Sequence, residues 1–98
     1  MQAFEIYIIY APWGCAGKVR PVLVRMQRDG AVFVYRITTQ RKAKFFIISD
    51  WQQAGLDKLS YVDTSVRVKL SQSIFDGKVA IGKLSDGDKM RLMQFLGN

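Results

Sequence analysis

The residue types available for catalysis are limited, because the chain contains no histidine and a single cysteine, Cys15. This excludes Ser-His-Asp and Cys-His nucleophilic chemistry, and also RNA cleavage by a pair of histidines. One cysteine cannot form an intramolecular disulfide, and no cluster of Cys and His is present to bind zinc. Any catalysis must therefore use Arg, Lys, carboxylates, hydroxyls or backbone groups, and we expect neither a metal nor another cofactor.

The positive charge of the chain favours a polyanionic partner. Fifteen Lys and Arg residues stand against eight Asp and Glu, which gives a formal net charge of +7 at pH 7. A nucleic acid, a membrane surface or an acidic protein segment would each satisfy that charge. The run Arg41-Lys42-Ala43-Lys44 either tracks phosphates or is a solvated loop. Trp13 either stacks on a base or packs onto the sheet.

Short segments rich in β-branched and aromatic residues predict a sheet. The predicted strands are Phe4–Tyr10, Val19–Met26, Ala31–Thr39, Phe45–Ile48, Leu59–Val62, Val66–Leu70 and Lys78–Leu84. Pro and Gly predict a loop over Ala11–Gly17, and Asp50 caps a helical turn, Trp51–Ala54, that ends at Gly55. Ser71–Phe75 is ambiguous. The first strand is too short to cross a bilayer and follows no basic residues, so it is not expected to be a signal peptide.

The last segment predicts a helix. Ser85 followed by Asp88 resembles a capping box. The apolar stripe, expected in the core, comprises Met90, Leu92, Met93 and Leu96. Short strands with one terminal helix and no βαβ alternation predict a mostly-β fold, a strongly bent antiparallel sheet or small barrel with a packed C-terminal helix. Ninety-eight residues predict a single domain, 1–98, in the cytoplasm.

Several segments, taken in order, resemble one known family. Gly17–Val24, with the sequence GKVRPVLV, is similar to a Gly-x-x-Arg-Pro-Val segment, and Ile37–Gln40 is similar to the end of the third strand in that family. Ile81–Ser85 and the following helix are similar to its last strand and closing helix. Asp50–Leu56 through Ser60–Asp63 resembles a form common in its PemK-like members. The family is that of the MazF/PemK toxins of type II toxin–antitoxin systems, and the resemblance covers nearly the whole chain.

This resemblance implies an SH3-like barrel and a metal-independent endoribonuclease (mRNA interferase) that cuts single-stranded RNA at short sequences. It assigns catalysis to Arg20 and Thr38. The expected substrate-binding residues are Trp13, Lys18, Gln40, Arg41, Lys42 and Asp63. The first loop carries Trp13 and Cys15 where one member type has a His. The implied partners are single-stranded RNA, a cognate antitoxin with an acidic, partly disordered segment, and a second copy of the chain, with no membrane.

RNA cleavage fits these residue types. The 2′-hydroxyl of RNA attacks the adjacent phosphate and gives a 2′,3′-cyclic phosphate and a 5′-hydroxyl, so the enzyme must align the groups and stabilise a phosphorane. The guanidinium of Arg20 suits charge stabilisation and proton donation to the leaving oxygen, but its pKa, above ~12, makes it a poor general base. Thr38 would bind the phosphate or orient the 2′-hydroxyl. The general base stays unassigned.

Two other functions remain open at this stage. One is a CcdB-like toxin that poisons DNA gyrase, although such proteins end in a tail with Trp and this chain ends in Phe95–Asn98. The other is a non-catalytic SH3-like module that binds nucleic acid or a peptide. Without the resemblance, Arg20 would be read as a solvated strand residue, Thr38 as an ordinary strand residue, and Asp63 as a turn residue.

The turn at Arg28-Asp29-Gly30 decides whether Arg20 and Thr38 share a face. A two-residue loop, Asp29-Gly30, aligns Arg20 with Thr39 and sends Thr38 to the opposite face. A three-residue loop, or a bulge further along, aligns Arg20 with Thr38. We predict the three-residue loop, with Gly30 at positive φ and a shared face. The buried residues expected to continue that face are Val22, Val24 and Val34.

Overall fold

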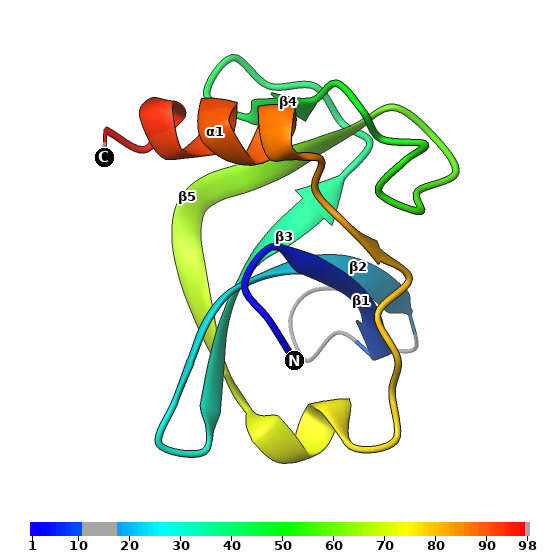
Figure 1. The fold of residues 1–98 in the computed structure, drawn as a ribbon, viewed down its shortest axis with the longest axis vertical. Helices are drawn as coiled ribbons and strands as arrows, with labels where there is room; N and C mark the ends of the chain where they lie inside the picture. Colours follow the sequence, from blue (N-terminus) through cyan, green and yellow to red (C-terminus); the bar gives the residue numbers. More distant parts are fainter. Residues whose placement is uncertain (11–17, 98) are drawn as a thin grey trace.

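The computed structural model describes residues 1–10 and 18–97, and these form a six-stranded antiparallel sheet with the order β4-β5-β3-β2-β1-β6. The strands are β1 (Glu5–Tyr10), β2 (Val19–Arg28), β3 (Ala31–Thr38), β4 (Phe46–Ile48), β5 (Ser60–Ser71) and β6 (Gly82–Lys83). A 3₁₀ helix, η1 (Gln72–Phe75), follows β5, and the helix α1 (Asp86–Phe95) closes the chain. The sheet curls strongly into a half-barrel, with α1 beside β4 at one end (Figure 1). The predicted mostly-β class with a C-terminal helix is confirmed.

Two predicted strands are one, and one predicted strand is mostly absent. β5 joins the predicted strands Leu59–Val62, of which Leu59 stays outside it, and Val66–Leu70 without interruption, and it bends strongly along its length (Figure 1). The predicted strand Lys78–Leu84 is wrong except for the two residues of β6. The Lys78 amide instead donates to the Phe75 carbonyl at 3.0 Å, which continues the turn after η1. The ambiguous segment Ser71–Phe75 contains η1, for which Ser71 is the N-cap.

The turn before β5 contacts β6 backbone to backbone. The Ala54 amide donates to the Asp50 carbonyl at 3.1 Å, so the predicted helical turn is present, and Gly55 ends it with φ +88°. A Cβ atom placed on Gly82 would lie 2.2 Å from the Ala54 carbonyl oxygen. Only glycine fits so close an approach, and this contact fixes the turn against the edge of the sheet.

Because the sheet curls, each of its faces buries a separate apolar cluster. One cluster lies under α1 and contains Phe4, Ile6, Leu23, Tyr35, Ile37, Phe46, Ile48, Ala54, Val62, Leu84 and Leu92. The other lies on the opposite face beside η1 and contains Tyr7, Ile9, Val22, Val24, Val32, Val34, Leu70 and Phe75. Of the predicted stripe, Leu92 is buried and Met93 and Leu96 are half-buried, but Met90 is 65% exposed, so its assignment to the core is wrong. No helix in the described residues is both long and apolar enough to cross a membrane.

The register of β2 and β3 is set by a tight turn and a bulge. Arg28 pairs with Ala31, so the loop has two residues and the predicted three-residue loop is wrong. Asp29 (φ +50°) and Gly30 (φ +78°) both have positive φ, as a type I′ turn requires. An irregularity between Val24 and Met26 then shifts the register by one residue. The predicted alternative of a bulge further along is therefore the one that occurs.

Beyond the bulge, Val24 pairs with Val34 and Val22 with Arg36. All three of the valines predicted to continue the face into the core are buried, at 0–1% exposure. Val22 and Arg36 are the last paired residues of the two strands. Counting two residues further along each strand, the same register would bring Arg20 opposite Thr38, and by alternation both side chains belong to the face of Val22 and Arg36.

Candidate functional site

The two candidate catalytic residues lie where β2 and β3 reach the edge of the second apolar cluster. Arg20 pairs with the buried Ile9 of β1 and is itself exposed to solvent. Thr38 is the last residue of β3, pairs with Tyr61 of β5 and is half-buried. Its hydroxyl oxygen accepts the Gln40 amide at 3.1 Å. A hydroxyl that accepts in this way can still donate its own hydrogen to a phosphate oxygen or a 2′-hydroxyl.

A second arginine, Arg36, occupies the same face. It lies directly between Val22 of β2 and Asp63 of β5, two residues before Thr38. Its Nη2 atom donates to Asp63 Oδ2 at 2.9 Å, while its buried Nε atom has no hydrogen-bond partner among the described residues. The side chain is 38% exposed, so its guanidinium is fixed from one side and open to solvent on the other. Sequence analysis missed Arg36, although its spacing of two from Thr38 on a strand was an available signal.

Asp63 is held as a carboxylate by its neighbours. Its side chain is buried, and its Oδ1 atom accepts the Ser65 amide at 3.0 Å and the Ser65 hydroxyl. Burial acts to raise the pKa of Asp63, but the hydrogen bonds from Ser65 and the charge and hydrogen bond of Arg36 outweigh it and lower that pKa below its usual value. As a carboxylate, Asp63 accepts the hydrogen bond from Arg36 Nη2 and thereby holds the Arg36 guanidinium in place.

That ion pair predicts an acid-sensitive stability. A carboxyl whose pKa is lower in the folded than in the unfolded chain stabilises the fold above the unfolded pKa of about 3.9, and this contribution is lost as the pH falls through the folded value. We expect Asp63→Asn to lower the free energy of unfolding at pH 7 by about 1–3 kcal/mol, as for a buried charge-assisted hydrogen bond. Urea unfolding at pH 7 and at acidic pH measures this. The difference between the two proteins should shrink at acidic pH, and a difference that stays constant would contradict the argument.

Asp63, one of the predicted substrate-binding residues, pairs with Arg36, and the others that the structure describes lie next to the strands in sequence. Lys18 precedes Arg20 by two residues and is exposed. Gln40, Arg41, Lys42 and Lys44 follow β3 and are also exposed, and the Lys42 ammonium lies 5.8 Å from the centre of the Phe45 ring. Trp13 and Cys15 fall outside the described residues. Lys18 therefore lies just before the start of β2, and Arg41, Lys42 and Lys44 lie in the segment that follows the end of β3.

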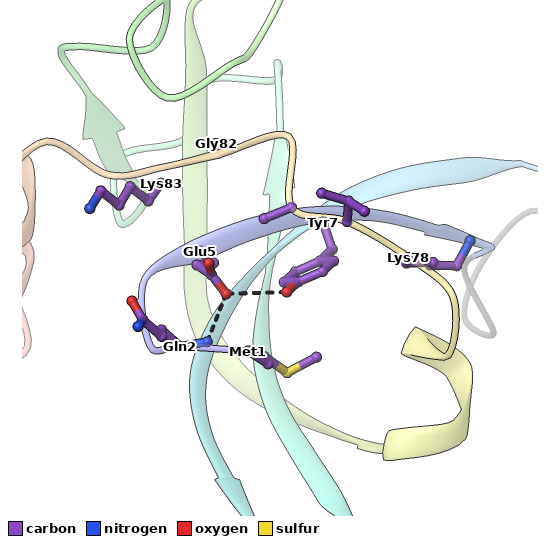
Figure 2. A pocket seen from close by; sticks show the side chains of 9 residues that line it. Met1, Gln2, Glu5, Tyr7, Lys78, Gly82 and Lys83 are labelled. Carbon is purple, nitrogen blue, oxygen red and sulfur yellow. Dashed lines mark hydrogen bonds between the residues drawn. The ribbon is translucent and has the colours of Figure 1, made fainter.

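A separate open pocket lies on the β1–β6 side of the molecule (Figure 2). It has a volume of about 500 Å³, and Lys78 and Lys83 lie on either side of Glu5. The Glu5 carboxylate accepts the Gln2 amide at 2.7 Å and the Tyr7 hydroxyl at 3.1 Å. Burial and the neighbouring Glu5 carboxylate raise the pKa of Tyr7, so the phenol stays protonated. Of the candidate residues that the structure describes, none lines this pocket.

Within residues 1–10 and 18–97, no three His, Cys, Asp or Glu side chains gather to form a metal-binding group. No protein-family model matches the chain, and no curated protein matches it. The chain is a small mostly-β protein with a curled half-barrel and a C-terminal helix. One face of its sheet carries Arg36 and, by strand alternation, Arg20 and Thr38.

Proposed function

We propose that this chain is a toxin endoribonuclease that cleaves single-stranded RNA without a metal. The observation that supports the proposal is the β2–β3 register, in which a bulge brings Val22 opposite Arg36. Two residues further along each strand, the same register would bring Arg20 opposite Thr38 on that face. Arg36, fixed by Asp63, lies on that face as well. A guanidinium and a hydroxyl donor on one face suit a phosphorane, which carries one negative charge more than the phosphodiester from which it forms.

In this proposal the 2′-hydroxyl loses its proton to water, its oxygen attacks phosphorus, the bond to the 5′-oxygen breaks, and a 2′,3′-cyclic phosphate remains. Arg20 stabilises the charge on the phosphoryl oxygens and donates a proton to the leaving 5′-oxygen, and its guanidine then regains a proton from water. Thr38 donates to the phosphate or orients the 2′-hydroxyl. Arg36 supplies a second positive charge, and the Asp63 carboxylate keeps that guanidinium from rotating away.

The flanking residues would bind the rest of the substrate. Lys18, Arg41 and Lys42 would contact phosphates on either side of the cleaved bond, and Gln40 would contact a base edge. Trp13 would stack on a base. Two partners complete the proposal, a second copy of the chain and a cognate antitoxin whose acidic segment neutralises the basic face.

The test is incubation of the purified protein with single-stranded RNA in excess EDTA. We expect fragments with 2′,3′-cyclic phosphate and 5′-hydroxyl ends, identified by end-labelling and mass spectrometry. The same oligonucleotide with 2′-O-methyl groups is the control, and it should stay intact because it has no nucleophile. RNA that stays intact while the protein inhibits DNA gyrase would instead support the gyrase-poisoning alternative.

A further inference from the structure

A second exposed basic surface lies on the opposite face of the sheet, beyond the bulge. Met26 of β2 pairs with Phe33 of β3, and Phe33 pairs with Lys69 of β5, so these three side chains share that face. Arg28 and Arg67 belong to it by alternation. We call these five residues, Met26, Arg28, Phe33, Arg67 and Lys69, the hairpin face. The β2–β3 hairpin extends to the end of the molecule away from α1 (Figure 1).

No described segment covers the hairpin face. Arg28, Arg67 and Lys69 are exposed, Met26 is 37% exposed and Phe33 is half-buried. η1 packs on the other side of these strands, because its Phe75 belongs to the cluster with Val32, Val34 and Leu70.

Arg67 joins the three strands of the hairpin face. Its guanidinium carbon lies 5.1 Å from the centre of the Phe33 ring, and its Nη1 atom lies 3.8 Å from the Met26 sulfur. The ion pairs of the described residues involve Arg36 and Arg91, so the three cations of the hairpin face have no carboxylate partner there. The guanidinium is therefore supported by an aromatic ring and available to an anion.

Two further cations extend this surface toward α1. Arg25 sits at the bulge beside Met26, and its guanidinium carbon lies 5.3 Å from the centre of the Phe4 ring. The Lys89 ammonium of α1 lies 5.2 Å from the same ring. Each cation rests against an aromatic ring, which orients it without neutralising it.

We propose that the hairpin face binds single-stranded RNA at a distance from the reaction centre. Cations that lack acidic partners match phosphates, and Phe33, Met26 and the plane of Arg67 provide a surface on which a base can stack. An acidic peptide would use the charge but leave the stacking surface unused. The choice of RNA as the ligand rests on the proposed function.

This arrangement makes the contribution of the hairpin face dependent on RNA length. Arg20 and Thr38 extend from one face of the sheet, and the hairpin face lies on the other. A short oligonucleotide bound at Arg20 does not reach the hairpin face, whereas a longer one can pass around the sheet and contact both surfaces.

The experiment compares the intact protein with the double variant Arg67→Gln/Lys69→Gln. The probes are uncleavable 2′-O-methyl RNAs of roughly four and sixteen nucleotides, which span the usual site sizes for single-stranded binding. We expect the variant to bind the long RNA about tenfold more weakly and to bind the short RNA unchanged. The slope of log affinity against log salt should fall by about 1.4 for two lost phosphate contacts on a single strand.

The matched control is Lys58→Gln/Lys78→Gln, which removes the same charge from exposed lysines elsewhere. Equal weakening by the control would show that only net charge matters and would overturn the proposal, as would unchanged binding of the long RNA by the hairpin-face variant. Displacement of the long RNA by poly-glutamate at equal charge concentration would favour an acidic protein as ligand and also overturn it. Arg67→Lys keeps the positive charge but loses the planar guanidinium. We expect this variant, too, to bind the long RNA more weakly than the intact protein, because a base can no longer stack on residue 67.

The outcome separates this proposal from the proposed function. A protein that binds long RNA through the hairpin face but never cleaves RNA would overturn the endoribonuclease and leave this surface standing. If the protein cleaves RNA, but Arg67→Gln/Lys69→Gln and the control variant bind the long RNA as tightly as the intact protein, the endoribonuclease proposal stands and the hairpin-face proposal is overturned.

Discussion

Replacing Arg20 by lysine is expected to reduce the rate of RNA cleavage roughly 100-fold or more, although the net charge does not change. Removal of one group that stabilises developing charge typically costs about 10²–10³ in rate. A lysine ammonium is a point charge and cannot donate two parallel hydrogen bonds to a phosphoryl group. Single-turnover cleavage of a defined oligonucleotide measures the loss.

Binding must be measured beside the rate. If Arg20 acts mainly on the transition state, the affinity of the variant for a 2′-O-methyl RNA should fall much less than the rate. Arg41→Lys is the matched control, because Arg41 is exposed in the loop after β3 and the chemical change is the same. Near-normal turnover in Arg20→Lys, or an equal loss in Arg41→Lys, would remove Arg20 from the mechanism.

The parts of the fold that the sequence predicted are those with strong local signals. β1, the start of β3 and the helix after Ser85 follow from β-branched runs, a turn within Arg28-Asp29-Gly30 and a capping residue. The strand predicted at Lys78–Leu84 had apolar residues, but Val79 is 85% exposed and faces no partner, so composition alone was misleading. Strand pairing is a property of the neighbours, which local propensity does not contain.

The site shows the same division. The alignment of Arg20 with Thr38 depends on one extra residue at the bulge near Arg25, and no residue type in β2 marks that position. The turn has two residues and not the predicted three, which alone would put Arg20 and Thr38 on opposite faces. The bulge between Val24 and Met26 shifts the register by one residue and so offsets the shorter turn. The position of Asp63 against Arg36 also needs the irregular pairing of β3 with β5 between Val34 and Arg36. Register over such distances is set by tertiary packing.

The sequence predicted the role of Asp88 at the start of the helix but not its contacts with the loop after β4. Its spacing from Ser85 predicted a capping box, and the Asp88 amide does donate to the Ser85 hydroxyl at 3.1 Å. The carboxylate, however, binds groups outside the first turn of the helix. It accepts the amides of Ser49 at 3.2 Å and Asp50 at 2.8 Å, and pairs with Arg91 at 2.6 Å. A contact across 38 residues has no local signal.

We therefore expect Asp88→Ala to be among the most destabilising single substitutions in the chain. Asp88 is 0% exposed, so its loss leaves two backbone donors without their acceptor inside the fold. Breaking such a buried charged network costs about 3–5 kcal/mol, out of a total stability of about 5–15 kcal/mol for a typical domain. Urea unfolding followed by circular dichroism at pH 7 measures the change.

Asp86→Ala is the matched control for Asp88→Ala. Asp86 lies in the first turn of the same helix but is exposed, so its loss removes only a favourable interaction with the helix dipole, worth about 0.3–1 kcal/mol. If the two variants lose similar stability, the Asp88 carboxylate is not what attaches the Ser49–Asp50 loop to α1. If Asp88→Ala loses far more, the helix start holds the loop that leads from β4 to the turn at Gly55.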